Sequence, residues 1–211
     1  MPTVYGVTLS LYTRKLRAFL AEKAISYELD VVVPGDSSPE YRAISPLGKV
    51  PAYRDQDVTL ADSSVISAYI ERIHPEPRLY PADPCAYGRA LWFEEYGDTA
   101  LAAVAGPIVY NRIIGPRFLG LPADTAAVEK AMAAMPQVLD YLETQLEGEY
   151  LVGESLSIAD IAVVTSFVHL RHVDIAPDPK RWPKLRGFAE RVASRPSFQT
   201  LFDEERAMLT A

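Results

Sequence analysis

The sequence predicts two domains, a mixed α/β domain followed by an all-helical domain. Strand-like and helix-like patterns alternate up to residue 73, whereas only helical periodicity is present after residue 86. The segment between them breaks any helix, because it holds four prolines: Pro75, Pro77, Pro81 and Pro84. We therefore expect a first domain over residues 1–78 and a second domain over residues 86–211.

The first domain is expected to contain a mixed sheet with helices on its faces. Residues of high β propensity predict four strands, at residues 3–9, 27–33, 51–54 and 58–60. Apolar residues at helical spacing predict helices at residues 14–24 and 62–73, and Ser38-Pro39 predicts the start of a short one. This order is compatible with a thioredoxin-like domain and with several other α/β folds.

Helical spacing also predicts which side chains are buried. In the helix over residues 62–73, four side chains are expected to face the interior: Val65, Ile66, Tyr69 and Ile73. The basic residues of the preceding helix are expected to form a solvated face that could attract an anionic peptide; they are Arg14, Lys15 and Arg17.

The second domain is predicted to be a bundle of helices, at residues 86–114, 124–146, 156–173, 183–194 and 196–209. The first of these is expected to be kinked or interrupted near Gly106-Pro107. In the third, Ser157 and Asp160 form an S-x-x-D capping box that marks the helix start. His169 and His172 lie on the same helix without a cluster of further ligands, so we expect no metal site.

Composition argues against several classes of function. The net charge of −7 disfavours a duplex-DNA-binding protein, which needs a basic face to neutralise phosphates. No apolar run is long enough to cross a membrane, and the first residues lack the pattern of a signal peptide. Cys85 is the one cysteine, which excludes an internal disulfide, a Cys-x-x-Cys redox pair and a multi-cysteine zinc site. We expect a cytoplasmic protein that binds neither nucleic acid nor membrane.

Three segments of the first domain are candidates for a binding site. Ser45–Pro51 leads into a strand, and its last proline is a candidate cis residue that would leave the Val50 backbone free to pair with an extended peptide. The helix that starts at Asp62-Ser63 offers free N–H groups and the positive end of its dipole to a carboxylate. Ser10 closes the first strand just before another helix. Together the three segments predict a site for one small anionic peptide.

The motifs in these segments resemble those of serine-type glutathione transferases. Residues 10–17, S-L-Y-T-R-K-L-R, are similar to the family's S-P-F-S-R-K-V-R segment, and residues 45–51, S-P-L-G-K-V-P, to its N-P-x-G-K-V-P segment. Asp62-Ser63 resembles the family's Glu-Ser pair, and residues 156–160 resemble the capping box of its helical domain. The four motifs occur in the family's order, and the resemblance, to a bacterial or a tau-, phi- or zeta-like member, covers nearly the whole chain.

The resemblance implies the glutathione transferase fold and an enzyme that conjugates glutathione to a small hydrophobic electrophile, as in detoxification. Ser10 would donate a hydrogen bond to the glutathione thiolate and so lower the thiol pKa from its free value near ~8.5. Thr13 is a second hydroxyl that could take this role, and Tyr5 marks where a tyrosine-type member would carry its donor. Leu11 departs from the family, because proline usually follows the serine.

The resemblance also implies how the peptide is held. Val50, next to Pro51, would pair its backbone with the cysteinyl part of glutathione. Asp62 would bind the γ-glutamyl ammonium, and Ser63 would bind the neighbouring carboxylate. Lys49 would lie near the glycyl carboxylate. Glutathione would be a substrate, with no metal required, and the protein would be a homodimer.

The electrophile would lie over Tyr12 and against the second domain. The residues expected to line it there are Pro107, Tyr110, Asn111, Ile114 and Phe118. Two alternatives use the same fold: a binding or regulatory protein with little catalysis, like the stringent starvation type, and a glutathione-dependent peroxidase or dehalogenase. The retained Lys49 and Asp62-Ser63 argue against loss of the glutathione site. The lack of a cysteine near the site disfavours omega- or beta-like thiol chemistry and maleylacetoacetate isomerase.

Overall fold

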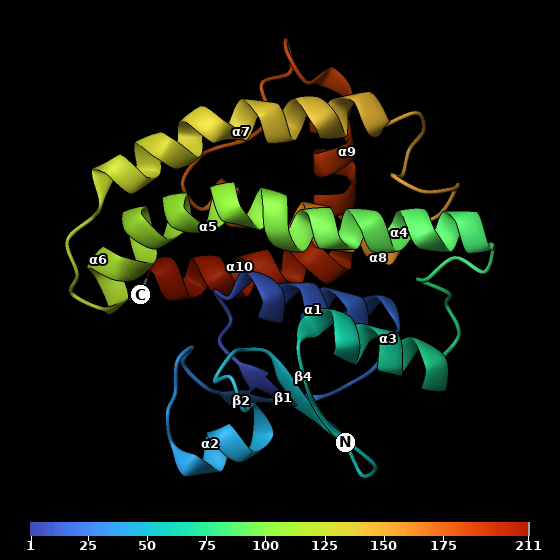
Figure 1. The fold of residues 1–211 in the computed structure, drawn as a ribbon, viewed down its shortest axis with the longest axis vertical. Coiled ribbons are helices and arrows are strands. Elements are labelled where there is room, and N and C mark those ends of the chain that lie inside the picture. The colour runs from blue at the N-terminus through green and yellow to red at the C-terminus, as the bar shows by residue number, and fades with distance from the viewer. Residues whose placement is uncertain (211) are drawn as a thin grey trace. The chain divides into compact units, whose positions relative to one another are not determined.

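The computed structural model describes residues 1–210, and the chain divides into two compact units. The first unit comprises residues 1–80 together with the residues from Gln199 onward, and the second comprises residues 81–198. The structure has a mixed α/β unit and an all-helical unit, as the sequence predicts (Figure 1). The expected second domain of 86–211 nevertheless differs from the structure, because most of the last helix packs with the N-terminal unit.

The first unit is built on a four-stranded mixed sheet with the strand order β2-β1-β3-β4. β1 pairs in parallel with β2 and antiparallel with β3, and β3 pairs antiparallel with β4. β1 is shorter than expected because the Ser10 amide donates to the Val7 carbonyl (3.0 Å) and turns the chain into the next helix. The strands are β1 Thr3–Gly6, β2 Glu28–Val31, β3 Ala52–Arg54 and β4 Thr59–Ala61.

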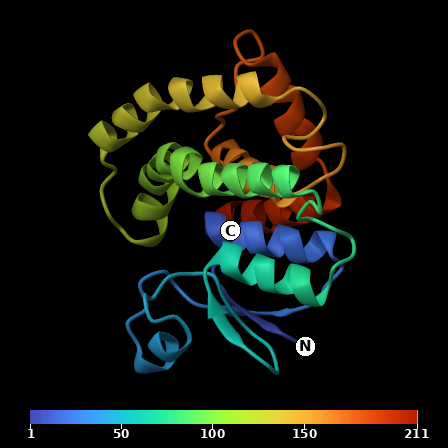
Figure 2. The ribbon, with the colours of Figure 1, turned by 45° about the vertical axis from the view of Figure 1, so that its right-hand side comes forward.

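Helices cover both faces of this sheet. α1 and α3 lie on one face and α2 on the other, as the two views in Figures 1 and 2 agree. Under α2, Tyr41 packs with Tyr5, Val50 and Ala52 of the sheet side in a small apolar core. The helices of this unit are α1 Leu11–Glu22, α2 Pro39–Ile44, α3 Ser63–Ile73 and, for the most part, α10 Pro196–Thr210.

The buried face of α3 differs from the predicted one. Val65 and Ile73, expected to face inward, are 50% and 46% exposed. The buried stripe instead combines two apolar and two polar residues: Ser63, Ile66, Ser67 and Ile70. The prediction was wrong because it counted apolar residues alone, whereas small serines complete the i, i+3, i+4, i+7 stripe.

The second unit begins with a continuous helical run that contains two π-helical segments. The regular α-helix is interrupted close to Pro107, by π-helical segments that lie before and after the helix that contains it. In the first of them, a Cβ at Gly97 would stand 2.9 Å from the Ala162 backbone, so only glycine allows this close approach to α8. The elements of the run are α4 Pro84–Tyr96, η1 Gly97–Leu101, α5 Ala102–Val109, η2 Tyr110–Ile114 and α6 Gly115–Phe118.

Three further helices complete the second unit, and the most buried of them starts at the predicted capping box. The Asp160 carboxylate accepts hydrogen bonds from the Ser157 amide (2.7 Å), the Ser157 hydroxyl (3.0 Å) and the Leu151 amide (2.8 Å). Burial raises the pKa of Asp160 to about 6, although the hydrogen bonds that its carboxylate accepts act to lower it. The helices are α7 Thr125–Gln145, α8 Ile158–Arg171 and α9 Pro183–Ala193.

Within residues 1–210, no helix combines the length and the apolar character that crossing a membrane requires.

Substitution Asp160→Asn tests the capping box. The asparagine amide keeps one acceptor oxygen, but its NH2 group replaces the other and faces buried donors. We therefore expect the free energy of unfolding to fall by about 1–3 kcal/mol. Thermal unfolding followed by circular dichroism should then show a melting temperature lower by roughly 2–12 °C.

A matched control lies on the same helix. The Ser166 hydroxyl is buried and has no hydrogen-bond partner within residues 1–210, so Ser166→Ala should leave stability unchanged or raise it. An Asp160→Asn protein that unfolds at the same temperature as Ser166→Ala would contradict this account of the helix start.

Candidate functional site

The strand register brings the three candidate segments to one edge of the sheet. Tyr5 of β1 pairs with Ala52 of β3, which in turn pairs with Ala61 of β4. The chain therefore leaves β1, enters β3 and leaves β4 at the same edge. The Asp62 amide donates to the Pro51 carbonyl across this edge (3.3 Å). Because Ser10 follows β1, the predicted convergence of the three segments is a property of the fold.

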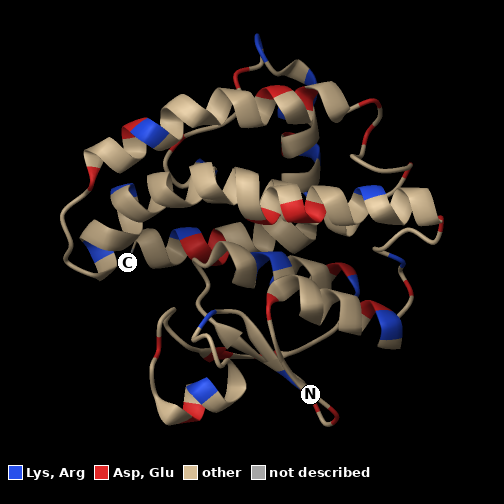
Figure 3. Ribbon diagram, viewed as in Figure 1, with Lys and Arg blue, Asp and Glu red and all other residues tan. Residues whose placement is uncertain are grey.

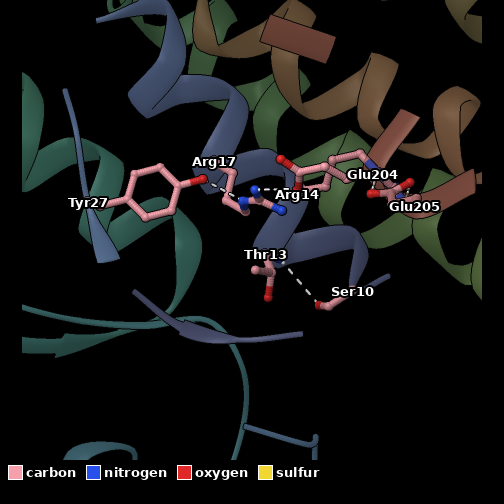
Figure 4. Close-up of polar contacts among 7 residues, drawn as sticks. All are labelled: Ser10, Thr13, Arg14, Arg17, Tyr27, Glu204 and Glu205. Atoms are coloured by element: carbon pink, nitrogen blue, oxygen red, sulfur yellow. Dashed lines mark hydrogen bonds and ion pairs between the residues drawn. The ribbon is translucent and has the colours of Figure 1, made fainter. Parts of the chain in front are cut away.

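Ser10 is the N-cap of α1. Its backbone is extended (φ −73°, ψ 127°), and its hydroxyl oxygen accepts a hydrogen bond from the Thr13 amide (3.3 Å; Figure 4). This contact uses a lone pair and leaves the hydroxyl proton available as a donor. Since the side chain is partly exposed, a ligand at this edge could accept that proton in a hydrogen bond. The positive end of the α1 dipole adds to the attraction for an anion there.

Thr13, the second candidate donor, is in a different environment. Its side chain is fully buried, and its hydroxyl has no hydrogen-bond partner among residues 1–210. It packs against β1 so closely that a Cβ at Gly6 would stand 2.5 Å from the Thr13 Oγ1 atom. Tyr5 is buried as well, with its ring 6.5 Å from that of Tyr41 and 5.8 Å from the Arg54 guanidinium carbon. Of these three hydroxyls, only that of Ser10 combines a free proton with exposure.

The segment before β3 presents unpaired backbone groups. The peptide bond between Val50 and Pro51 is cis, as predicted. The preceding carbonyl, that of Lys49, accepts hydrogen bonds from the Tyr41 hydroxyl (2.7 Å) and the Ser45 hydroxyl (2.8 Å), which hold the segment in place. Burial raises the pKa of Tyr41, so its hydroxyl keeps the proton that it donates. Within residues 1–210 the Val50 N–H and C=O make no hydrogen bond, and the Lys49 side chain is exposed.

The start of α3 offers a carboxylate and a free amide side by side. Asp62 is the N-cap, and one oxygen of its carboxylate accepts from the Ser64 amide (2.9 Å) and the Val65 amide (3.2 Å). Its φ of 87° is unusual for a residue with a side chain, which is a form of backbone strain found at ligand-binding positions. The Ser63 amide lies at the first helical position and makes no hydrogen bond within residues 1–210. The same turn therefore presents one negative group and one anion-binding group.

The basic residues of α1 are not the solvated face that the sequence predicted. Arg14 and Lys15 are fully buried, and Arg17 is nearly so. Arg14 pairs with Glu205 of α10, and the Lys15 ammonium donates to the Ser64 hydroxyl (2.8 Å) at the start of α3. The expectation was wrong because the partners lie far along the chain, on elements whose position only the fold determines.

The residues expected to contact an electrophile differ in exposure. In the first unit Tyr12 is exposed, and in the second unit Tyr110 and Phe118 are exposed. Asn111 is buried, and its amide is committed: it donates to the Pro107 carbonyl (2.9 Å) and accepts from the Asp124 amide (3.0 Å). It therefore connects η2 to the N-cap of α7. Pro107 and Ile114 are half-buried.

Other candidate chemistry finds little support in the described residues. No group of three or more histidine, cysteine or acidic residues within residues 1–210 is arranged to hold a metal ion. His169 is buried in α8, and His172 is the residue that caps the end of this helix. Cys85 is exposed near the start of α4.

Comparison with known proteins shows the same two-part organisation. The family description "Glutathione S-transferase, N-terminal domain" matches residues 4–78, and "Glutathione S-transferase, C-terminal domain" matches residues 82–196. A probable glutathione S-transferase of rice (Oryza sativa subsp. japonica) is 30% identical over 204 residues, covering 93% of both chains. Glutathione S-transferase 3 of maize (Zea mays) is 29% identical over 207 residues, covering 93% of this chain and 90% of the maize protein.

Solved structures agree with this similarity. A glutathione S-transferase from Rhodospirillum rubrum F11 superimposes with a TM-score of 0.86 and 25% identity, covering 95% of this chain and 91% of that one. Glutathione S-transferase-I bound with the ligand lactoylglutathione superimposes with a TM-score of 0.85 and 25% identity, covering 96% and 98% of the two chains.

The contact between Gly6 and Thr13 generates a test of the site geometry. Gly6→Ala places a methyl group 2.5 Å from the Thr13 hydroxyl and should lower the free energy of unfolding by about 1–3 kcal/mol, because the tightly packed core resists the added volume. Thr13→Ala removes the clashing atoms, so the double variant should recover most of this loss. Urea unfolding of the four proteins gives the coupling energy, and additive effects would contradict the contact.

Proposed function

Because the chain belongs to the glutathione S-transferase superfamily and is a glutathione-conjugating enzyme, we propose that its site activates the glutathione thiol with one hydroxyl and no catalytic base. In this proposal Ser10 donates a hydrogen bond to the glutathione sulfur. A hydrogen bond to the charged form lowers a thiol pKa, so more of the bound glutathione is thiolate at neutral pH. The thiolate then attacks the electrophile, and serine itself forms no covalent bond.

The observation that carries this assignment is the hydrogen bond from the Thr13 amide to the Ser10 oxygen. It orients the hydroxyl while leaving its proton free, which is the arrangement that a thiolate needs. Thr13 supplies this orienting amide, and the burial of its own hydroxyl favours Ser10 over Thr13 as the donor.

We propose that the three edge segments hold the peptide part of glutathione. The unpaired Val50 backbone groups, beside Pro51, would form a short antiparallel ladder with the cysteinyl residue. The Ser63 amide and the N-terminus of α3 would bind the γ-glutamyl carboxylate, and the free oxygen of Asp62 would bind its ammonium. The exposed Lys49 side chain would pair with the glycyl carboxylate.

Three finer features of the proposal rest on family resemblance. They are a homodimer, a cytoplasmic location and a role in detoxification. For the electrophile, the exposed Tyr12, Tyr110 and Phe118 are retained as proposed contacts, together with Pro107 and Ile114. Asn111 is given a structural role instead, because both ends of its amide are already used.

The donor assignment is tested by removing the hydroxyl in two ways. Ser10→Ala should lower kcat/KM for a standard aromatic electrophile by about 10- to 100-fold, the equivalent of one lost charge-assisted hydrogen bond. Ser10→Gly lacks the hydroxyl too, but glycine is a better N-cap than alanine, so it controls for loss of the cap. Thr13→Val keeps the shape of the buried side chain and should stay within about 2-fold of the parent enzyme, as expected for a buried hydroxyl without a partner.

The pH dependence should change in the same variants. Absorbance titration of bound glutathione should show a thiol pKa that rises toward the free value in Ser10→Ala and Ser10→Gly but not in Thr13→Val. If Thr13→Val loses activity and Ser10→Gly does not, the donor has been assigned to the wrong residue. Failure of the parent protein to bind immobilised glutathione would instead favour the non-catalytic alternative.

Asp62→Asn separates charge from capping. Asparagine is an N-cap as good as aspartate and tolerates a positive φ, so stability should change little. Loss of the negative charge should weaken glutathione binding roughly 10-fold or more, since a charge-assisted contact to the ammonium is lost. Calorimetric titration measures the affinity, and thermal unfolding in the absence of ligand supplies the control. Unchanged affinity would show that Asp62 only caps the helix.

A further inference from the structure

The most deeply buried ion pair of the first unit joins the helix of Ser10 to the C-terminal helix. Arg14 of α1 and Glu205 of α10 are both 0% exposed. Their contact is bidentate, with Nε 2.7 Å from one carboxylate oxygen and Nη2 2.7 Å from the other (Figure 4). A two-pronged contact of this kind fixes the orientation of the guanidinium as well as its position.

A second pair strengthens the same connection. Glu204, next in sequence to Glu205, pairs with Arg17 at 2.7 Å, and Arg17 also donates to the Tyr27 hydroxyl. Residues three apart on a helix share a face, so Arg14 and Arg17 present their charges to α10 together. Figure 3 shows the acidic and basic segments that follow one another on α10.

The pair at Arg14 acts on the turn that carries the donor hydroxyl. The Arg14 amide donates to the Ser10 carbonyl (2.9 Å) and closes the first turn of α1, in which the Thr13 amide holds the Ser10 hydroxyl. The direction of that hydroxyl therefore depends on how this turn is rotated about the helix axis. Glu205 holds this turn in place through the Arg14 side chain. The segment of Val50 is held separately, because Tyr41 and Ser45 donate to the carbonyl that precedes it.

We propose that Glu205 is a positioning residue for thiol activation, which it supports by holding the first turn of α1 through Arg14. The inference rests on the proposed function of Ser10. Glu205 contacts neither glutathione nor the electrophile and exchanges no proton. Among the described residues, the charged and titratable groups that contact this part of α1 include those of Arg14, Lys15, Arg17, Tyr27, Glu204 and Glu205.

The test replaces both charges at once. Removing one partner would leave the other charge buried and unpaired, which strongly destabilises a protein. Replacing a buried pair by apolar residues of similar volume is often neutral for stability. In Arg14→Met/Glu205→Leu the turn loses its fixed orientation but keeps its packing. We expect the thiol pKa of bound glutathione to rise, with kcat/KM lower by about 10-fold at pH 6.5 and by about 2-fold or less at pH 9, where the thiol ionises unaided.

The pH profile distinguishes positioning from general damage. A structural defect that lowers the fraction of competent enzyme would reduce kcat/KM by the same factor at every pH and would overturn the proposal, as would an unchanged profile. Affinity for S-methylglutathione, which has no thiol to activate, should be unchanged. If the double variant does not fold, Glu205→Asp retains the charge on a shorter arm and should show the same pH-dependent loss to a smaller degree.

Two parallel measurements complete the design. Arg181 and Asp140 form a solvent-exposed ion pair of similar length, 2.7 Å, in the second unit, and Arg181→Met/Asp140→Leu controls for loss of an ion pair away from α1, with the parent profile expected. Ser10→Ala is measured alongside. If Ser10→Ala leaves the thiol pKa unchanged, the proposed function itself fails. If Ser10→Ala raises that pKa and the Arg14/Glu205 double variant does not, only the role of Glu205 is overturned.

Discussion

The burial of three cationic side chains of α1, those of Arg14, Lys15 and Arg17, is the constraint on which the first unit depends. A buried charge is costly unless it is paired and hydrogen-bonded, and each of these cations has its partners outside α1. Arg14 uses α10, Lys15 uses the start of α3, and Arg17 uses α10 together with Tyr27. The helices that frame the sheet edge are therefore held by directional polar contacts as well as by apolar packing.

This arrangement is compatible with the proposed activation of the glutathione thiol by a single hydroxyl at the sheet edge. Two helices begin there, and each begins with a side chain that accepts hydrogen bonds from its own first turn. Ser10 keeps a proton for a ligand, and Asp62 keeps a carboxylate oxygen. Fixed donors and dipoles of this kind stabilise an anion without having to reorganise when it forms. In the proposed mechanism the protein supplies this polar environment and the substrate glutathione supplies the reactive sulfur.

The sequence predicts most of the local structure of the site, because caps and turns depend on neighbouring residues. The cap at Ser38, the capping box at Ser157 and the cis bond before Pro51 all follow from short motifs, and the structure contains each of them. Even the meeting of the three segments can be anticipated from the order of strands. The choice of donor between Ser10 and Thr13 cannot be predicted in this way, since both are hydroxyls in one turn and differ only in how deeply they are buried.

Long-range burial is what sequence patterns miss. Arg14 and Glu205 are 191 residues apart, and neither looks different in sequence from an ordinary surface residue. A run of basic residues on one helix and of acidic residues on another is the available signal, but it does not tell which pairs will lose contact with water. The prediction of the inner face of α3 was wrong for a related reason, because its buried stripe includes serines that hydropathy alone assigns to solvent.

The discontinuity of the first unit has a consequence for how the chain is made. Its sheet and first helices precede the helical unit in the chain, so they are synthesised before it, and α10 is synthesised after it. Until α10 has been synthesised, Arg14 lacks its partner Glu205, and burying its unpaired charge inside the N-terminal unit would be costly. The helical unit, continuous in sequence, can complete its packing first. Domains usually fold in the order of synthesis, whereas here the first unit has all its residues only after the second unit has been made.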